Sequence, residues 1–299
     1  MKMKTSKQQA TVGVIGGSGL YNIEGLTSTR SIRVRTPFGV PSDAITLGTL
    51  EGIRVAFLSR HGQGHLLNPS GINYRANIFA LKSLGVSHVI SISAVGSMKE
   101  SIRPGDVVIP DQFIDLTKRR PSTFFENGIV AHVAFGEPVC AELGQALCSS
   151  AKQVGATVHP RGTYLCMEGP QFSTKAESQL YRQWGVDVIG MTNMPEAKLA
   201  REAELSYATV ALVTDYDCWH ETEEAVTVEA VLATLHRNVA LAKQILRAVM
   251  PSFTDIRSCT CHRALENAIL TAPKRIPAAV RTRLAVLIDR ALRTQKGAR

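Results

Sequence analysis

The sequence predicts an α/β fold, a single domain with a central mixed β-sheet flanked by helices, followed by a helical C-terminal extension. Short apolar runs of strand type alternate with segments that carry apolar residues at three- and four-residue spacing, which is the pattern of strands and covering helices. The 299 residues, 44% of them hydrophobic, suffice for one large core. We therefore expect a main domain over residues 10–251 and a basic helical extension over residues 252–299.

The predicted strands are short runs rich in aliphatic and β-branched residues. In chain order they cover residues 12–15, 44–50, 53–58, 88–93, 106–109, 162–167, 186–191 and 207–213. The predicted helices cover residues 74–84, 141–154, 175–184, 195–205 and 228–250. Pro195 suits the first turn of a helix, whereas Pro251 ends the long helix because proline lacks the amide hydrogen. A basic helical segment interrupted by prolines finishes the chain.

The composition argues against membrane and nucleic-acid functions. No run of 18 apolar residues and no signal peptide is evident, so we expect a cytoplasmic protein without a membrane partner. The net charge is +9, but the last 48 residues hold ten Lys or Arg against three Asp or Glu. The sequence has no nucleic-acid-binding motif and no aromatic residues interleaved with the basic ones, so this excess of positive charge favours a solvated helical surface. A basic nucleic-acid-binding module is the alternative function outside the enzymes. The six cysteines are expected to be reduced thiols.

The run 207–213 ends in two acidic residues, Asp215 and Asp217. Ligands of open α/β sheets bind outside the carboxyl ends of the strands, so this pair is placed to meet a small molecule. A 6-aminopurine fits, because one carboxylate can accept from the amine while the other, kept protonated by burial and its charged neighbour, donates to N7. A loop cap or a surface cation site is the simpler interpretation and stays open.

Four further strand ends carry groups suited to an anion. They contribute a glycine turn with Ser18, then Arg60 and His61, then Ser93 and Ala94, and finally Thr192 before a helix N-terminus. The glycine turn matches neither the dinucleotide fingerprint nor the P-loop. His61 and His65 have the spacing of helical zinc ligands, but glycines between them disfavour a helix, so no metal is expected. Each strand end has a simple explanation as a turn or cap, but together they predict a phosphate site.

These motifs resemble those of the trimeric purine nucleoside phosphorylases, specifically the 5′-methylthioadenosine phosphorylase branch, from about residue 14 to residue 250. The resemblance rests on Ile15-Gly-Gly-Ser-Gly19, Thr36-Pro-Phe-Gly39, Pro41-Ser42, Arg60-His61-Gly62, Asn73-Tyr-Arg-Ala-Asn77, Arg103-Pro-Gly-Asp106, Asp111-Gln-Phe-Ile-Asp115, Glu168-Gly-Pro170, Met191-Thr192, Pro195-Glu196 and Thr214-Asp-Tyr-Asp-Cys-Trp219. The last motif is the most telling, because relatives that act on 6-oxopurines typically have asparagine in the base-reading position.

The resemblance implies a pentosyltransferase of methionine and purine salvage. Inorganic phosphate would attack C1′ of 5′-methylthioadenosine to give adenine and 5-methylthioribose 1-phosphate, with no cofactor and no metal. A purine nucleoside phosphorylase for adenosine, methylthioinosine or other purine nucleosides is the alternative. The residues implied for phosphate are Ser18, Arg60, His61, Ser93, Ala94 and Thr192. Met191 would lie under the ribose and Phe172 against the base, while Asp215 and Asp217 would read N7 and the 6-amine.

The resemblance also assigns residues to substrate specificity and assembly. The apolar residues Val228, Val231 and Leu232 share one face of a predicted helix. The resemblance implies that this face lines the methylthio pocket, whereas the periodicity alone would indicate an ordinary helix face buried in the core. Val228 replaces the histidine that meets a 5′-hydroxyl in 6-oxopurine relatives. Ser173 is a further implied specificity residue, and His132 matches a residue supplied by a neighbouring subunit, which implies a homotrimer. Gln171, where some relatives have arginine, and Cys259-Thr-Cys261 in the extension are departures.

Overall fold

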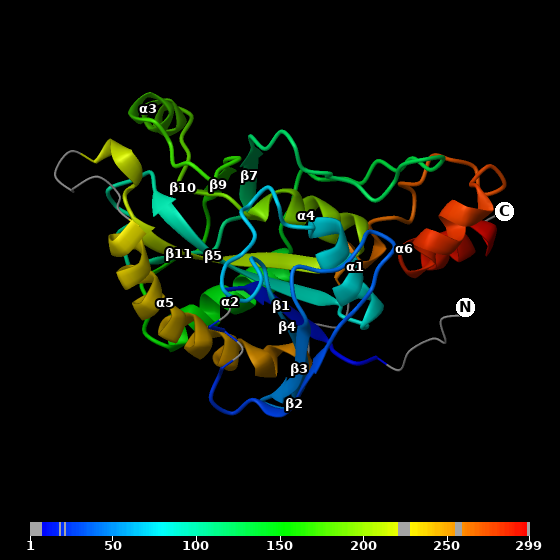
Figure 1. The fold of residues 1–299 in the computed structure, drawn as a ribbon, viewed down its shortest axis with the longest axis horizontal. Helices are drawn as coiled ribbons and strands as arrows, with labels where there is room; N and C mark the ends of the chain where they lie inside the picture. The colour runs from blue at the N-terminus through cyan, green and yellow to red at the C-terminus, as the bar shows by residue number, and fades with distance from the viewer. Residues whose placement is uncertain (1–7, 18, 21, 221–227, 255–258, 298–299) are drawn as a thin grey trace.

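The computed structural model describes residues 8–17, 19–20, 22–220, 228–254 and 259–297. Within these residues it contains one eleven-stranded sheet with helices on both faces (Figure 1). The strands are β1 (Val12–Gly16), β2 (Thr27–Ile32), β3 (Ile45–Leu50), β4 (Ile53–Ser59), β5 (His88–Ser97), β6 (Val107–Val108), β7 (Gln112–Asp115), β8 (Val158–His159), β9 (Thr163–Cys166), β10 (Val188–Gly190) and β11 (Ser206–Asp215).

The sheet is mixed and branches at β5. Its main path runs β2-β3-β4-β1-β5-β10-β9-β7, and β11 pairs with β5 and β6 outside that path. Strands β1, β4, β5 and β11 are mutually parallel, whereas β10 runs antiparallel to the end of β5. The carboxyl ends of four parallel strands therefore meet at one edge of the sheet.

The helices cover the sheet in two layers, because each has one apolar face to bury. They are α1 (Tyr74–Ser83), α2 (Ala141–Gln153), α3 (Lys175–Gln183), α4 (Asn193–Glu202), α5 (Val228–Val249) and α6 (Ala278–Gly297). Buried side chains of α1, α4 and α6 share one hydrophobic cluster, and those of α2 and α5 share a second. Strand β5 contributes to both clusters, as expected of a strand buried on both faces.

The predicted α/β architecture is confirmed. All eight predicted strands and five predicted helices are present, with ends that differ from the prediction by at most four residues. Strands β2, β7 and β8 were not predicted. Strand β2 is a polar edge strand that is exposed over almost its whole length, and β8 has only two residues, so neither has the apolar pattern on which the prediction relied.

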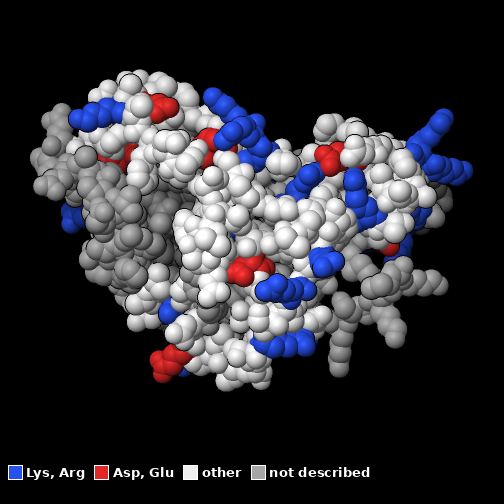
Figure 2. Space-filling model, viewed as in Figure 1, with Lys and Arg blue, Asp and Glu red and all other residues white. Residues whose placement is uncertain are grey.

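The C-terminal extension packs against the main domain. Leu284, Leu287 and Ile288 of α6 are buried in the same cluster as Phe124 and Ile129. In the face shown in Figure 2, Lys and Arg side chains surround this end of the molecule. Among the described helices, none is both long and apolar enough to cross a bilayer.

Candidate active site

Asp215 and Asp217 lie where β11 leaves the sheet. Asp215 is the last residue of the strand, and its Oδ1 accepts a hydrogen bond of 2.8 Å from the backbone N–H of Asp217. Its Oδ2 accepts from the Thr214 hydroxyl at 2.6 Å. Asp217 has a positive φ of 54°, an uncommon conformation that Asp tolerates better than most residues. The turn thus brings both carboxylates together at the carboxyl edge of the sheet.

The side chain of Asp217 sits in a buried polar environment. Its Oδ2 accepts from the hydroxyl of Ser178 on α3 at 2.6 Å, and Ser178 is fully buried. Burial raises the pKa of Asp217 above its usual range, and the nearby Asp215 raises it further, while the Ser178 hydroxyl lowers it. Asp217 is therefore the carboxyl group that holds a proton more readily than a normal aspartate.

Gly96 of β5 leaves room for this pair. It is the register partner of Asp215 on the neighbouring strand. A Cβ at this position would lie 2.9 Å from Asp215 Oδ1 and 3.4 Å from Asp217 Cβ. Any larger residue would displace the carboxylates, so the close approach of the two strand ends depends on glycine.

Arg60 is buried and paired with Glu196 of α4. Nε donates to Oε2 at 2.9 Å and Nη2 donates to Oε1 at 3.0 Å, a bidentate pair with exposed fractions of 2% for Arg60 and 0% for Glu196. The guanidinium also donates to Ser91 Oγ at 2.7 Å and to the Ile92 carbonyl at 2.9 Å. Burial alone lowers the pKa of Arg60, but the Glu196 carboxylate outweighs it and the net shift is upward.

This arrangement revises the role expected of Arg60. The sequence suggested an open arginine fork for phosphate oxygens, but the fork is taken by Glu196. Nη1 keeps one N–H for which the described residues provide no acceptor. The guanidinium can therefore donate one hydrogen bond from Nη1 to an anion, and its charge is partly neutralised by Glu196. It cannot bind the anion in a bidentate way.

His61 directly follows Arg60 and is held by the loop after β4. Its Nδ1 lies 2.8 Å from the Leu67 carbonyl, which can only accept, so Nδ1 carries the proton and Nε2 carries the lone pair. Burial lowers the pKa of His61 to about 4. At neutral pH the ring is uncharged and offers an acceptor, which suits a protonated oxygen of phosphate.

Two predicted phosphate residues meet across the sheet. Strand β10 runs beside the end of β5, so the Thr192 hydroxyl lies 3.3 Å from the Ser93 hydroxyl. Tyr164 OH also lies 3.2 Å from Ser93 Oγ. Ala94 is exposed although Ser93 and Val95 are buried, so β5 opens to solvent there. Two hydroxyl groups and the solvent-exposed residue Ala94 therefore lie next to Ile92, whose carbonyl accepts from Arg60.

Arg120, which the sequence analysis missed, ties together the turns beside Met191. Its Nη1 donates to the Met191 carbonyl at 2.7 Å and to the Met194 carbonyl at 2.6 Å, and its Nη2 donates to the Glu168 carbonyl at 2.6 Å. A Cβ at Gly169 would lie 2.5 Å from Met191 Sδ, so the thioether packs on that turn. Arg120 lies in an irregular stretch without periodicity, and no pattern in the sequence marks it.

The residues after this turn differ in exposure. Ser173 is buried, and its carbonyl accepts from the Cys218 thiol at 3.3 Å, which joins this loop to the Asp217 turn. Phe172, by contrast, is 48% exposed.

His132 lies in another part of the chain. It is exposed, and its backbone N–H donates to the Ala268 carbonyl at 2.9 Å, next to the bridge between Ala131 and Ile269. The C-terminal extension is at the opposite end of the molecule from α3 (Figure 1). Within one chain, His132 is therefore far from the Asp217 turn.

The structure does not describe the side chains of the remaining predicted site residues. Ser18 is not among the described residues, and neither are the side chains of Val228, Val231 and Leu232, although α5 begins at Val228. Their assignments remain predictions from the resemblance.

Sequence and structure comparisons identify related proteins. A family model described as the phosphorylase superfamily matches residues 11–251. The S-methyl-5′-thioadenosine phosphorylase of Geobacter sulfurreducens is 57% identical over 281 residues, which cover 94% of this chain and 98% of the relative. The protein of the same name from Koribacter versatilis is 54% identical over 288 residues, covering 96% and 99%.

Solved structures agree in fold. A methylthioadenosine phosphorylase from an Antarctic soil metagenomic library superimposes with a TM-score of 0.90 at 50% identity, covering 94% of this chain and 99% of the other. The methylthioadenosine phosphorylase of Schistosoma mansoni in complex with adenine has a TM-score of 0.80 at 34% identity, covering 94% and 98%.

Proposed function

The chain belongs to the phosphorylase superfamily, and we propose that it catalyses the phosphorolysis of 5′-methylthioadenosine, releasing adenine and 5-methylthioribose 1-phosphate. The observation that carries this proposal is the Asp215–Asp217 turn at the carboxyl end of β11, beside the hydroxyl and histidine groups of the neighbouring strand ends. A base reader and an anion site lie at the same edge of one sheet, as a reaction between a nucleoside and phosphate requires.

We propose that phosphate binds to Ser93, Thr192, His61 and Ala94, with Ser18 as a further predicted ligand. Three features support this: the 3.3 Å approach of the two hydroxyls, the lone pair on His61 Nε2, and the exposure of Ala94 to solvent. The Arg60–Glu196 pair lies beneath and keeps a positive edge near the anion without presenting a full unpaired charge. Neutral His61 accepts a proton-bearing oxygen and so leaves another oxygen to attack.

We propose that the adenine base binds to Asp215 and Asp217, with Phe172 against the base and Met191 under the ribose. We assign the proton to Asp217, because burial and Asp215 raise its pKa, and we assign acceptance from the 6-amine to Asp215. A phosphate oxygen forms a bond to C1′ as the C1′–N9 bond breaks and its electron pair passes into the purine. The proton moves to N7, so adenine leaves as a neutral base, which lowers the barrier of an oxocarbenium-like transition state.

The 5′ substituent is proposed to meet Val228, Val231 and Leu232 at the start of α5, with Ser173 nearby in the site. An apolar face favours a methylthio group over a hydroxyl, which would lose its water there without gaining a partner. The names of the relatives from Geobacter and Koribacter support this preference.

A homotrimer is proposed as the working form. His132 is exposed, and its backbone N–H donates to Ala268 of the C-terminal extension, which lies at the opposite end of the molecule from α3 in Figure 1; this supports its contribution to a neighbour's site. The reaction as written needs no metal and no organic cofactor, and methionine and purine salvage would use its products. A cytoplasmic location is supported by the six cysteines, which are all free thiols, as a reducing compartment keeps them.

The test is adenine release from 5′-methylthioadenosine with and without inorganic phosphate, run beside adenosine, inosine and methylthioinosine at equal concentrations. We expect phosphate-dependent release that is fastest with methylthioadenosine. Preference for an inosine-type nucleoside would contradict the base assignment, and preference for adenosine would contradict the 5′ pocket. Release without phosphate would contradict phosphorolysis itself.

A further inference from the structure

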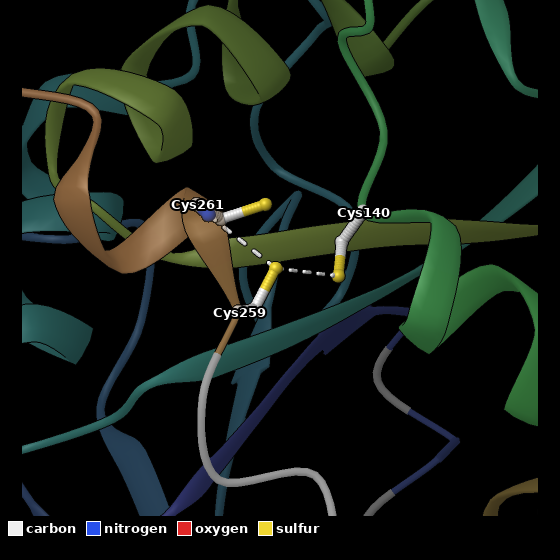
Figure 3. A group of neighbouring side chains, drawn as sticks. All are labelled: Cys140, Cys259 and Cys261. Carbon is white, nitrogen blue, oxygen red and sulfur yellow. Dashed lines mark hydrogen bonds between the residues drawn. The ribbon is translucent and has the colours of Figure 1, made fainter.

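Three cysteines that are distant in sequence meet in one buried group. Cys140, Cys259 and Cys261 are 1%, 7% and 6% exposed, and their three sulfur atoms all lie within 4.8 Å of one another. Figure 3 shows the sulfurs converging from two sides, Cys140 from the loop that enters α2 and the other two from the C-terminal extension. The sequence predicted free thiols here, which the structure has, but not their meeting with Cys140.

We propose that this group is a binding site for a thiophilic metal cation with a filled d shell, zinc(II) or copper(I). Cations of this kind prefer sulfur ligands. Two sulfurs on one tetrahedral zinc ion, at about 2.3 Å each, are about 3.8 Å apart. The Cys140–Cys259 separation of 3.3 Å and the 4.8 Å limit for the whole group bracket this value.

The surroundings favour thiolate ligands over inert buried thiols. The backbone N–H of Cys261 donates to Cys259 Sγ at 3.3 Å, the type of outer hydrogen bond that orients and stabilises a ligating sulfur. Cys140 is the N-cap residue of α2, where the helix dipole favours a negative charge. The Cys140 backbone is itself fixed, because its N–H donates to the Tyr207 carbonyl at 2.9 Å.

The position of the site indicates a structural role. Cys140 borders the beginning of β11, whereas Asp215 is at the end of that ten-residue strand, roughly 30 Å away at the usual rise per residue. A bound cation would join the C-terminal extension to α2 and to β11. It would take no part in the chemistry at the carboxyl edge.

The experiment uses the full chain, reduced, freed of metal with a chelator and kept anaerobic. Zinc(II) and copper(I) are added separately, and bound metal is measured by elemental mass spectrometry and by competition with a chromophoric chelator. We expect one equivalent per chain and a thermal midpoint raised by about 5 °C at saturating metal. The competition assay tells which of the two cations binds more tightly.

The variants Cys140→Ser and Cys261→Ser are expected to lose the bound equivalent and the thermal shift. Cys148→Ser is the matched control, because Cys148 is a buried cysteine of α2 outside the group, and it is expected to bind as the wild type does. Retention of the equivalent in Cys140→Ser would overturn the site. So would the absence of uptake of either cation by the reduced wild type.

Two measurements on the wild type alone keep the proposal testable if a variant does not fold. The ultraviolet charge-transfer band of the cadmium(II) form counts bound thiolates, and we expect three; none would overturn the proposal. Intact mass detects a disulfide as the loss of two hydrogen atoms. The isolated protein could contain a disulfide, and after reduction the chain could fail to bind metal. That combined result would overturn the cation site and identify a redox-active cysteine pair instead.

Discussion

Arg60 and Glu196 form a bidentate ion pair in which both side chains are almost completely shielded from water. Arg60 comes from the end of β4 and Glu196 from the first regular turn of α4, so the pair connects two elements that are 136 residues apart in the chain. Because the pair lies against Ser91 and Ile92 of β5, it forms the floor under the proposed phosphate position.

Glu196→Gln is expected to lower the free energy of unfolding by about 3–5 kcal/mol, because it leaves a buried guanidinium without its counter-charge. Urea unfolding at pH 7 measures this. Glu126→Gln is the matched control, since it breaks the more exposed Arg75–Glu126 pair and should cost below about 1 kcal/mol. Equal losses in the two variants would contradict the importance of burial.

Asp215→Asn is expected to reduce kcat/KM for 5′-methylthioadenosine by about 10²- to 10⁴-fold, because an amide turns an N–H donor toward the 6-amine. Methylthioinosine should suffer less, since its 6-oxo group accepts from that amide. Steady-state kinetics with both nucleosides tests the change in preference. Unchanged activity on the adenine nucleoside would show that Asp215 does not read the base.

Ser178→Ala is expected to move the basic limb of the pH profile of kcat/KM to higher pH. The Ser178 hydroxyl lowers the pKa of Asp217, so its removal raises that pKa and the protonated donor persists further into the basic range. The wild-type and variant profiles for 5′-methylthioadenosine, compared from pH 5 to 9, measure the shift. A shift to lower pH would argue that the ionised form of Asp217 is the active one.

His61→Phe is expected to raise KM for phosphate by about 10- to 100-fold, because phenylalanine fills the space of the ring but provides no acceptor. The pKa of His61 is lowered to about 4, so the ratio of wild-type to variant kcat/KM for phosphate should stay flat from pH 5.5 to 8. A change in that ratio near pH 6.5 would mean that a charged imidazole binds the anion.

Glu202→Gln is expected to stabilise the protein at pH 8 by about 2–3 kcal/mol and to have little effect at pH 4.5. Burial raises the pKa of Glu202 to about 7, against the hydrogen bonds from Thr123 and Phe124. Between pH 4.5, the pKa of Glu202 in the unfolded chain, and pH 7 the folded chain holds a proton that the unfolded chain releases. The wild-type protein therefore loses stability as the pH rises through this range, and the Gln variant does not. Urea unfolding at both values tests the sign, and a larger gain at pH 4.5 would refute it.

Part of the fold could be predicted from periodicity, and part could not. Strands β5 and β11 are buried over most of their length, and their sequences are rich in aliphatic, β-branched and small residues, a strand pattern that stands out along the chain. Strand β2 is polar and exposed, and its strand conformation comes from pairing with β3, which no local pattern announces. Local signals identified the elements with the strongest burial and missed those that depend on a partner.

The same division holds for the site. Motifs at strand ends pointed to Asp215, Asp217, His61 and Thr192, because residue types suited to a base or an anion follow recognisable strands. Arg120 escaped notice, since it reaches the Met191 turn from an irregular stretch 71 residues away. The pairing of the Arg60 fork with Glu196 was missed for a related reason: both residues were noticed, but their contact spans 136 residues.

The sequence by itself determined the α/β class, the order of the main elements and the family to which the motifs belong, because apolar periodicity and strand-end residues are local properties of the chain. Only the tertiary structure decided which charges neutralise each other, which aspartate is buried beside Ser178, and that Cys140 meets Cys259 and Cys261. Those properties depend on the distance and dielectric environment between residues far apart in sequence, which are fixed only when the sheet and its covering helices pack together.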